Sequence, residues 1–269
     1  MKTLSKVYMG LVLMFLYVPI FVLIVFSFNE TKSRSVFSGF TLDWYAKLFR
    51  NEVIISSLIN TLIIAVIASI AATVLGTLAA IGINSMRKVP KAVVMNITNM
   101  PIVNPEIVTG VSLMLLFVFF AARMNLEFGF VTLLIAHITF DVPYVILNVM
   151  PKFRQMDPNL FEAAQDLGCS PFTALHKVIL PEIMPGVVSG FLMSFTFSLD
   201  DFVISYFTSG STSQTLPITI YSMTRRKISP EINALSTIIF VVVVIVLVVK
   251  HIIETRQERI NRANGGDEG

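Results

Sequence analysis

The sequence predicts an all-α polytopic membrane protein with six transmembrane helices and both termini in the cytoplasm. Hydrophobic residues make up 55% of its 269 residues, and only 14% are charged, against roughly 25% in soluble domains. A soluble core of this size could not bury its 22 Phe and 13 Met. The single cysteine, Cys169, excludes a disulfide scaffold. The net charge of +3 fits basic loops at a membrane surface better than a soluble enzyme or a nucleic-acid module.

Six segments are apolar over the roughly 20 residues that a helix needs to cross a bilayer core. They span residues 8–28, 58–83, 93–122, 128–150, 183–207 and 235–253. The first is predicted to be a retained helix, because its apolar run is too long for a signal peptide and no cleavage site with small residues follows it. If the N-terminus lies in the cytoplasm, twelve of the 20 Lys and Arg residues fall in cytoplasmic segments and eight fall in outer segments. This excess places both termini and the 151–182 loop in the cytoplasm.

The third segment is too long for one straight helix, because 30 residues would extend about 45 Å. Pro101 and Pro105 are expected to break it. Asn104, Pro105 and Glu106 then predict a new helix start, with Asn as the cap, Pro at the first position and Glu in the first turn. Broken helices at membrane depth are typical of transport sites. The alternative is a short interfacial helix followed by an ordinary span.

Four acidic residues lie within the predicted spans, whereas the span cores contain no Lys or Arg: Glu106, Asp141, Asp200 and Asp201. An Asp in the middle of a membrane helix is unfavourable by about 2.5–3.5 kcal/mol. We therefore expect these carboxylates to face a path through the protein that favours cations.

Small and polar residues recur along one face of the fifth segment: Gly186, Gly190, Ser194, Ser198, Asp201 and Ser205. Ser198 and Asp201 are expected to line the path on this face. Asp200, as the residue before Asp201, is rotated about 100° around the helix axis from Asp201 and cannot share all of its contacts. The alternative is a packing seam that lets another helix approach closely, with Asp201 hydrogen-bonded across it.

The fourth segment also has a polar face, formed by His137, Asp141, Tyr144 and Asn148. Its His–Asp pair, four residues apart, could be a structural hydrogen bond, part of the path, a proton relay or a metal site. Two potential ligands are too few to assign a metal.

The cytoplasmic 151–182 loop predicts two short helices joined by an elbow. Asp157 and Pro158 start the first helix, and Gly168 can end it in the left-handed conformation. Ser170 and Pro171 start the second helix, which is expected to end near residue 179, before Pro181. A rigid elbow of this kind can dock onto a cytoplasmic partner.

This loop resembles the EAA loop of ABC importer permeases, whose pattern is E-A-A-x-x-x-G followed after nine residues by I-x-L-P. The matching residues are Glu162, Ala163, Ala164, Gly168, Leu180 and Pro181, and Val178 stands where Ile is usual. The resemblance implies the type I ABC importer permease fold. It also implies that these residues couple the chain to a groove of an ATPase subunit. No P-loop or hydrolase motif occurs in the sequence, so the chain is not expected to be an enzyme or to carry a metal or other cofactor. ATP and magnesium would bind to the ATPase subunit.

Further segments narrow the resemblance to the second permease of spermidine/putrescine importers. They are residues 40–45, 60–61, 198–202, 216–223 and 229–234, whereas Lys227 departs from the family pattern. The implied partners are a second permease subunit, two copies of an ATPase subunit, an external polyamine-binding protein and membrane lipid, with no nucleic acid, in a bacterial inner membrane. An importer of another small cation such as thiamine, or of an organic phosphonate, is the alternative. An anion would require basic groups along the path. The preference between spermidine and putrescine stays open.

The candidate substrate path therefore comprises Trp44, Glu106, Asp141, Ser198, Asp200 and Asp201. Spaced carboxylates and aromatic rings suit a ligand with several ammonium groups. Trp44 lies on an outer amphipathic segment with Leu48 one turn on, either as a membrane-interface anchor or at the surface where substrate arrives. The expected organisation is a first helix and outer segment over 1–57, the transmembrane domain over 58–253 and a polar cytoplasmic tail over 254–269.

Overall fold

The computed structural model of the protein describes residues 2–31, 36–124, 127–226, 230–241 and 244–245. Within these ranges the chain is helical, and its one β contact is an isolated bridge between Asn29 and Phe40. Five described helices are long and apolar enough to cross a membrane: Lys6–Ser27, Glu52–Asn84, Glu106–Arg123, Phe130–Gln155 and Pro171–Asp200. The predicted all-α membrane fold is confirmed. The predicted sixth span, 235–253, lies partly outside the described residues, which show the apolar helix Pro230–Val241.

The chain divides into two compact units. Residues 1–54 and 220–269 form the first, which includes α1 (Lys2–Ser27) and α2 (Asp43–Arg50). Asp43 in the first turn of α2 and basic residues in its last turn complement the helix dipole. Trp44 and Leu48, one turn apart, are its buried residues.

Residues 55–219 form the second unit. Its elements are α3 (Glu52–Asn84), α4 (Lys88–Val103), α5 (Glu106–Met124), α6 (Phe130–Gln155), α7 (Leu160–Asp166), α8 (Pro171–Ala174), the π-helix η1 (Leu175–Ile179), α9 (Leu180–Asp200), α10 (Val203–Thr208) and α11 (Leu216–Arg226). The first residues of α3, up to Ile54, and most of α11, from Ile220 onward, belong to the first unit.

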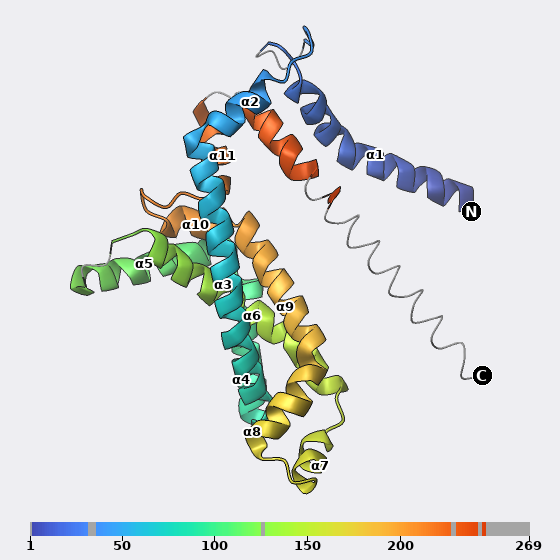
Figure 1. The fold of residues 1–269 in the computed structure, drawn as a ribbon, viewed down its shortest axis with the longest axis vertical. Helices are drawn as coiled ribbons and strands as arrows, with labels where there is room; N and C mark the ends of the chain where they lie inside the picture. The colour runs from blue at the N-terminus through green and yellow to red at the C-terminus, as the bar shows by residue number, and fades with distance from the viewer. Residues whose placement is uncertain (1, 32–35, 125–126, 227–229, 242–243, 246–269) are drawn as a thin grey trace. The chain divides into compact units, whose positions relative to one another are not determined.

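The tightest packing in this unit is between α6 and α9, which run side by side (Figure 1). A Cβ at Gly190 would lie 3.2 Å from the Cα of Val145, and one at Gly186 would lie 2.9 Å from the carbonyl oxygen of Asn148. Glycine therefore lets the two backbones approach closely. The small-residue stripe serves as a packing seam along this part of α9.

The third predicted span is interrupted at one proline only. Pro101 lies inside α4, whereas the chain turns extended at Asn104 (ψ 137°), and α5 begins at Glu106. The residue before a proline is disfavoured in the helical conformation, so Asn104 before Pro105 ends α4. The predicted break at Pro101 is wrong. The predicted restart after Asn104 is confirmed, although α5 begins at Glu106, one residue later than expected.

The fifth predicted span differs from the expectation at both ends. It is broken at Asp201, where ψ is 119°, so 183–207 is not one helix. At the other end, α8, η1 and α9 run without interruption from Pro171 to Asp200. The predicted helix end before Pro181 is wrong: this residue lies in the first turn of α9, directly after the π-helix. The wider π-turn leaves room for the proline ring.

Candidate functional site

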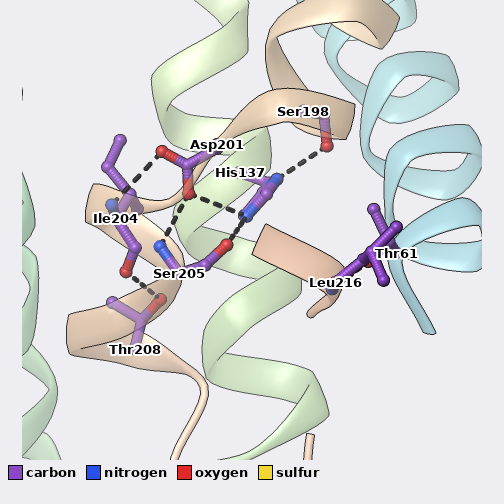
Figure 2. A network of polar contacts seen from close by, with 8 residues as sticks. All are labelled: Thr61, His137, Ser198, Asp201, Ile204, Ser205, Thr208 and Leu216. Carbon is purple, nitrogen blue, oxygen red and sulfur yellow. Dashed lines mark hydrogen bonds and ion pairs between the residues drawn. The ribbon is translucent and has the colours of Figure 1, made fainter. Parts of the chain in front are cut away.

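His137 on α6 holds both sides of the break between α9 and α10 (Figure 2). Its Nδ1 is 2.6 Å from the hydroxyl of Ser198, before the break, and its Nε2 is 3.0 Å from the hydroxyl of Ser205, after it. The same Nε2 lies 3.6 Å from Oδ2 of Asp201, at the break. All four side chains are buried. The cluster fixes the position of α10 against α6.

Asp201 is the residue that makes the break possible. Its Oδ1 accepts the backbone N–H of Ile204 at 3.2 Å, and its Oδ2 accepts that of Ser205 at 2.7 Å. A helix start leaves such N–H groups without a backbone partner, and a carboxylate at this position satisfies them. Asp201 therefore caps α10, in addition to its contact with His137.

The predicted pairing of His137 with Asp141 is not formed. His137 turns to α9 and α10, because both its ring nitrogens find partners there. No group of three metal-ligating side chains occurs within the described ranges. Of the roles considered for His137, the geometry favours structural hydrogen bonding, with partners from another helix.

Asp141, one turn along α6, has an unusual environment. Its side chain is fully buried, yet neither carboxylate oxygen accepts a hydrogen bond from any described residue. The hydroxyl of Ser194 on α9 is also buried and unpaired among these residues. It lies close enough to interact with the carboxylate electrostatically, although the two groups do not meet in hydrogen-bonding geometry.

Aromatic rings lie beside Asp141. The ring of Tyr144 is 4.5 Å from that of Phe197 and 5.2 Å from that of Phe140, between centroids. Tyr144 is within electrostatic range of both Asp141 and Glu106. The charges of these two predicted path carboxylates therefore both act on Tyr144.

The other predicted path residues lie in different settings. Ser198 and Asp201 are buried in the His137 cluster, while Glu106 and Asp200 are exposed at a helix start and a helix end. Trp44 belongs to the first unit and is 5% exposed. Its indole N–H donates to the carbonyl of Asn29 at 2.7 Å, and Nζ of Lys47 lies 4.5 Å from its ring centroid. A role for Trp44 toward substrate or lipid stays a prediction.

The elbow predicted in the 151–182 loop is built around Gly168, whose φ is +88°. The N–H of Gly168 donates to Gln165 and that of Cys169 to Ala164, which is the Schellman pattern that closes α7. Ser170 then caps α8 by accepting the N–H of Thr173. Two large apolar side chains project from the elbow, with Leu167 87% and Phe172 78% exposed.

Residues 72–263 match the family described as the binding-protein-dependent transport system inner membrane component. The chain belongs to this family. Spermidine/putrescine permease proteins PotC are 39% identical over 93% of the chain in Haemophilus influenzae and 36% over 97% in Escherichia coli K12, covering 96% of each relative. The putrescine permease protein PotI of Escherichia coli K12 is 38% identical over 94% of the chain and 92% of the relative.

A solved structure supports the fold of this inner-membrane permease. A bacterial ABC transporter that imports the acidic polysaccharide alginate has a TM-score of 0.68 over 94% of the chain and 95% of its own, at 14% identity. The chain therefore has the fold of an ABC importer permease, as the EAA resemblance implies.

Sequence reasoning about the permease missed several side chains at these sites. Phe140 precedes Tyr144 by four residues, which places both on one helix face, but Phe197 comes from α9 and no spacing within α6 could reveal it. On the elbow, Leu167 and Phe172 fall at variable positions of the EAA pattern. Large apolar residues in the turn between two short helices were the available signal.

Proposed function

We propose that the chain is one permease subunit of an ATP-driven importer that moves polyamines into the cell. The observation that carries the proposal is the buried carboxylate of Asp141, one helical turn from the aromatic cluster that Tyr144 forms with Phe140 and Phe197. Ammonium groups bind carboxylates through charge-assisted hydrogen bonds and bind aromatic faces through cation–π attraction. The 36–39% identity to spermidine/putrescine permeases supports the same substrate class.

The importer would contain a second permease subunit, two copies of an ATPase subunit and an external binding protein that delivers the polyamine. ATP and magnesium would bind to the ATPase, and this chain would carry no catalytic group or cofactor. The elbow supports this assembly, because Leu167 and Phe172 present an apolar surface on a turn of fixed shape. Apolar side chains on such a surface are typical of a protein interface.

Within this assembly, the predicted path residues divide by role. Glu106 and Asp200, which are exposed, would attract the cationic substrate. Asp141 lies deeper, beside the aromatic cluster. Ser198 and Asp201 would act mainly by holding the broken helix in place, and Trp44 would stabilise the outer segment before α3.

Uptake of radiolabelled spermidine and putrescine by vesicles that carry the assembled importer tests the function. We expect ATP-dependent uptake of at least one polyamine that unlabelled thiamine does not inhibit. Uptake of thiamine or of a phosphonate in place of both polyamines would overturn the proposal.

Glu106→Gln is expected to reduce polyamine uptake by roughly two- to fivefold, as for loss of an exposed charge contact. The change keeps side-chain size but removes charge at the start of α5. Glu52→Gln is the matched control, because Glu52 is also an exposed acid in the first turn of a long apolar helix. Equal losses in the two variants would show that Glu106 is only a helix-start charge.

Gly168→Val is expected to uncouple transport from ATP hydrolysis. A Cβ at this position meets nothing within 4 Å, so the effect comes from the positive φ alone. A β-branched residue in the left-handed conformation is strained by about 1–3 kcal/mol. This strain would lower the population of the native elbow conformation by roughly five- to a hundredfold. Spermidine uptake and pull-down of the ATPase subunit measure the loss. Gly168→Asn should retain more of both activities, since Asn adopts the left-handed conformation readily. Similar behaviour of the two variants would contradict the mechanism.

A further inference from the structure

The buried carboxylate of Asp141 has an energetic cost that the described part of the chain does not offset. Both its oxygens and the hydroxyl of Ser194 lack a hydrogen-bond partner there, and both side chains are completely buried. Burying a charge without a partner is among the least favourable arrangements in a protein. Asp201 lies within electrostatic range of Asp141 and adds negative potential. His137, one turn earlier on α6, has both ring nitrogens engaged by the cluster at the break.

The two Asp141 oxygens and the Ser194 hydroxyl oxygen could all accept hydrogen bonds from a single chemical group. Two carboxylate oxygens on α6 and one hydroxyl oxygen on α9 are buried at the seam, and the hydroxyl is near enough to act on the carboxylate. A primary ammonium group carries three N–H donors and no acceptor. It would satisfy all three oxygens and neutralise the carboxylate at the same time.

The surroundings suit the rest of an alkyl amine. The rings of Tyr144 and Phe197 pack at a tilt of 59° with their centroids 4.5 Å apart, and the centroid of the Phe140 ring lies 6.2 Å from that of Phe197. Rings at this position can pack against methylene groups and attract a nearby cation. The charge of Glu106 also acts on Tyr144, so a second carboxylate contributes negative potential near the rings.

We infer that Asp141 and Ser194, with the rings of Tyr144 and Phe197, form a buried subsite for one terminal ammonium group of the substrate. This inference rests on the proposed function. Because Asp141 is fully buried, the ammonium group reaches it only when the seam between α6 and α9 opens. Helices α6 and α9, which pack closely in the structure, must therefore separate locally during the transport cycle, when the bundles of a transporter move around the binding site. Closing the seam on the ammonium group supplies the partners that Asp141 lacks.

Asp141→Asn separates this subsite from a structural role, because the two roles predict opposite changes in stability. A neutral amide is less costly to bury than an unpaired carboxylate, so the melting temperature of the assembled importer should stay equal or rise. Spermidine uptake should fall by roughly ten- to a hundredfold, the effect of losing one buried charge-assisted contact. Added spermidine should raise the melting temperature of the wild-type importer but not that of the variant.

Ser194→Ala and Ser189→Ala provide the matched comparison on α9. Ser194→Ala should weaken spermidine uptake severalfold, whereas Ser189→Ala should not, because Ser189 is exposed and hydrogen-bonds to Asn148. Wild-type uptake by Asp141→Asn overturns the subsite, and so does a variant that fails to assemble, since that result makes the carboxylate structural. If the wild-type importer transports no polyamine, the proposed function itself fails. Polyamine uptake that is normal in both the wild type and Asp141→Asn rejects the subsite alone.

Discussion

Gly190→Leu is expected to reduce the yield of assembled permease by at least about tenfold. The seam leaves no room for a side chain at this position, because a Cβ would already lie 3.2 Å from both the Cα and the Cγ1 of Val145. Overpacking of a core by a few methylene groups costs about 1–3 kcal/mol, and more where the opposing atom belongs to the backbone. The helices would have to separate, which would also displace Ser194 from Asp141. Yield after size-exclusion chromatography, with membrane levels from a blot, measures the effect.

Gly82→Leu is the control for the size and hydrophobicity of the added side chain. Gly82 lies in α3, and a Cβ there meets nothing within 4 Å. This variant should assemble normally. Wild-type yield for Gly190→Leu would mean that α6 and α9 are not held at the close distance the glycine seam indicates.

The long helices could be predicted from the sequence because apolar length alone determines them. The predicted segments 58–83 and 128–150 lie within a few residues of α3 and α6. The breaks were harder to place, since a proline permits a break without requiring one. Pro101 and Pro181 both lie within continuous helical stretches, whereas Pro105 follows an extended residue. Whether a helix breaks at a proline depends on the packing around it in three dimensions, which the neighbouring residues in the sequence do not reveal.

The contacts of the candidate site were also only partly predictable from the sequence. Spacing placed Asp141 and His137 on one face, but it could not reveal that the partners of His137 come from α9 and α10. Ser198, Asp201 and Ser205 do converge, although the continuous helix predicted to align them is broken. Asp is a preferred helix cap, so Asp201 before an apolar run was a possible signal for a helix start. The unpaired state of Asp141 depends on contacts across the seam and could be seen only in the structure.

Asp201→Asn is expected to destabilise the importer, contrary to what the sequence alone suggests. With no basic residue in the span, removal of the charge should be harmless to assembly. The structure reverses that expectation, because the two Asp201 oxygens accept two different backbone N–H groups. An Asn side chain has one acceptor oxygen, so one of these bonds is lost, and the negative charge beside His137 is lost as well. Replacing a cap by Ala costs about 0.5–2 kcal/mol, and Asn, which keeps one bond, should lose part of that. We expect a lower melting temperature and strongly reduced spermidine uptake.

Asp200→Asn is the matched variant, one residue earlier and exposed. It removes the same charge at the same depth but leaves the cap of α10 and the His137 cluster intact. Its melting temperature should equal that of the wild type, and any loss of uptake then reports on attraction of the cationic substrate alone. The decisive comparison is between stability and uptake in the two variants. If Asp201→Asn lost uptake at an unchanged melting temperature, Asp201 would act on the substrate directly, and the break between α9 and α10 would be held without it.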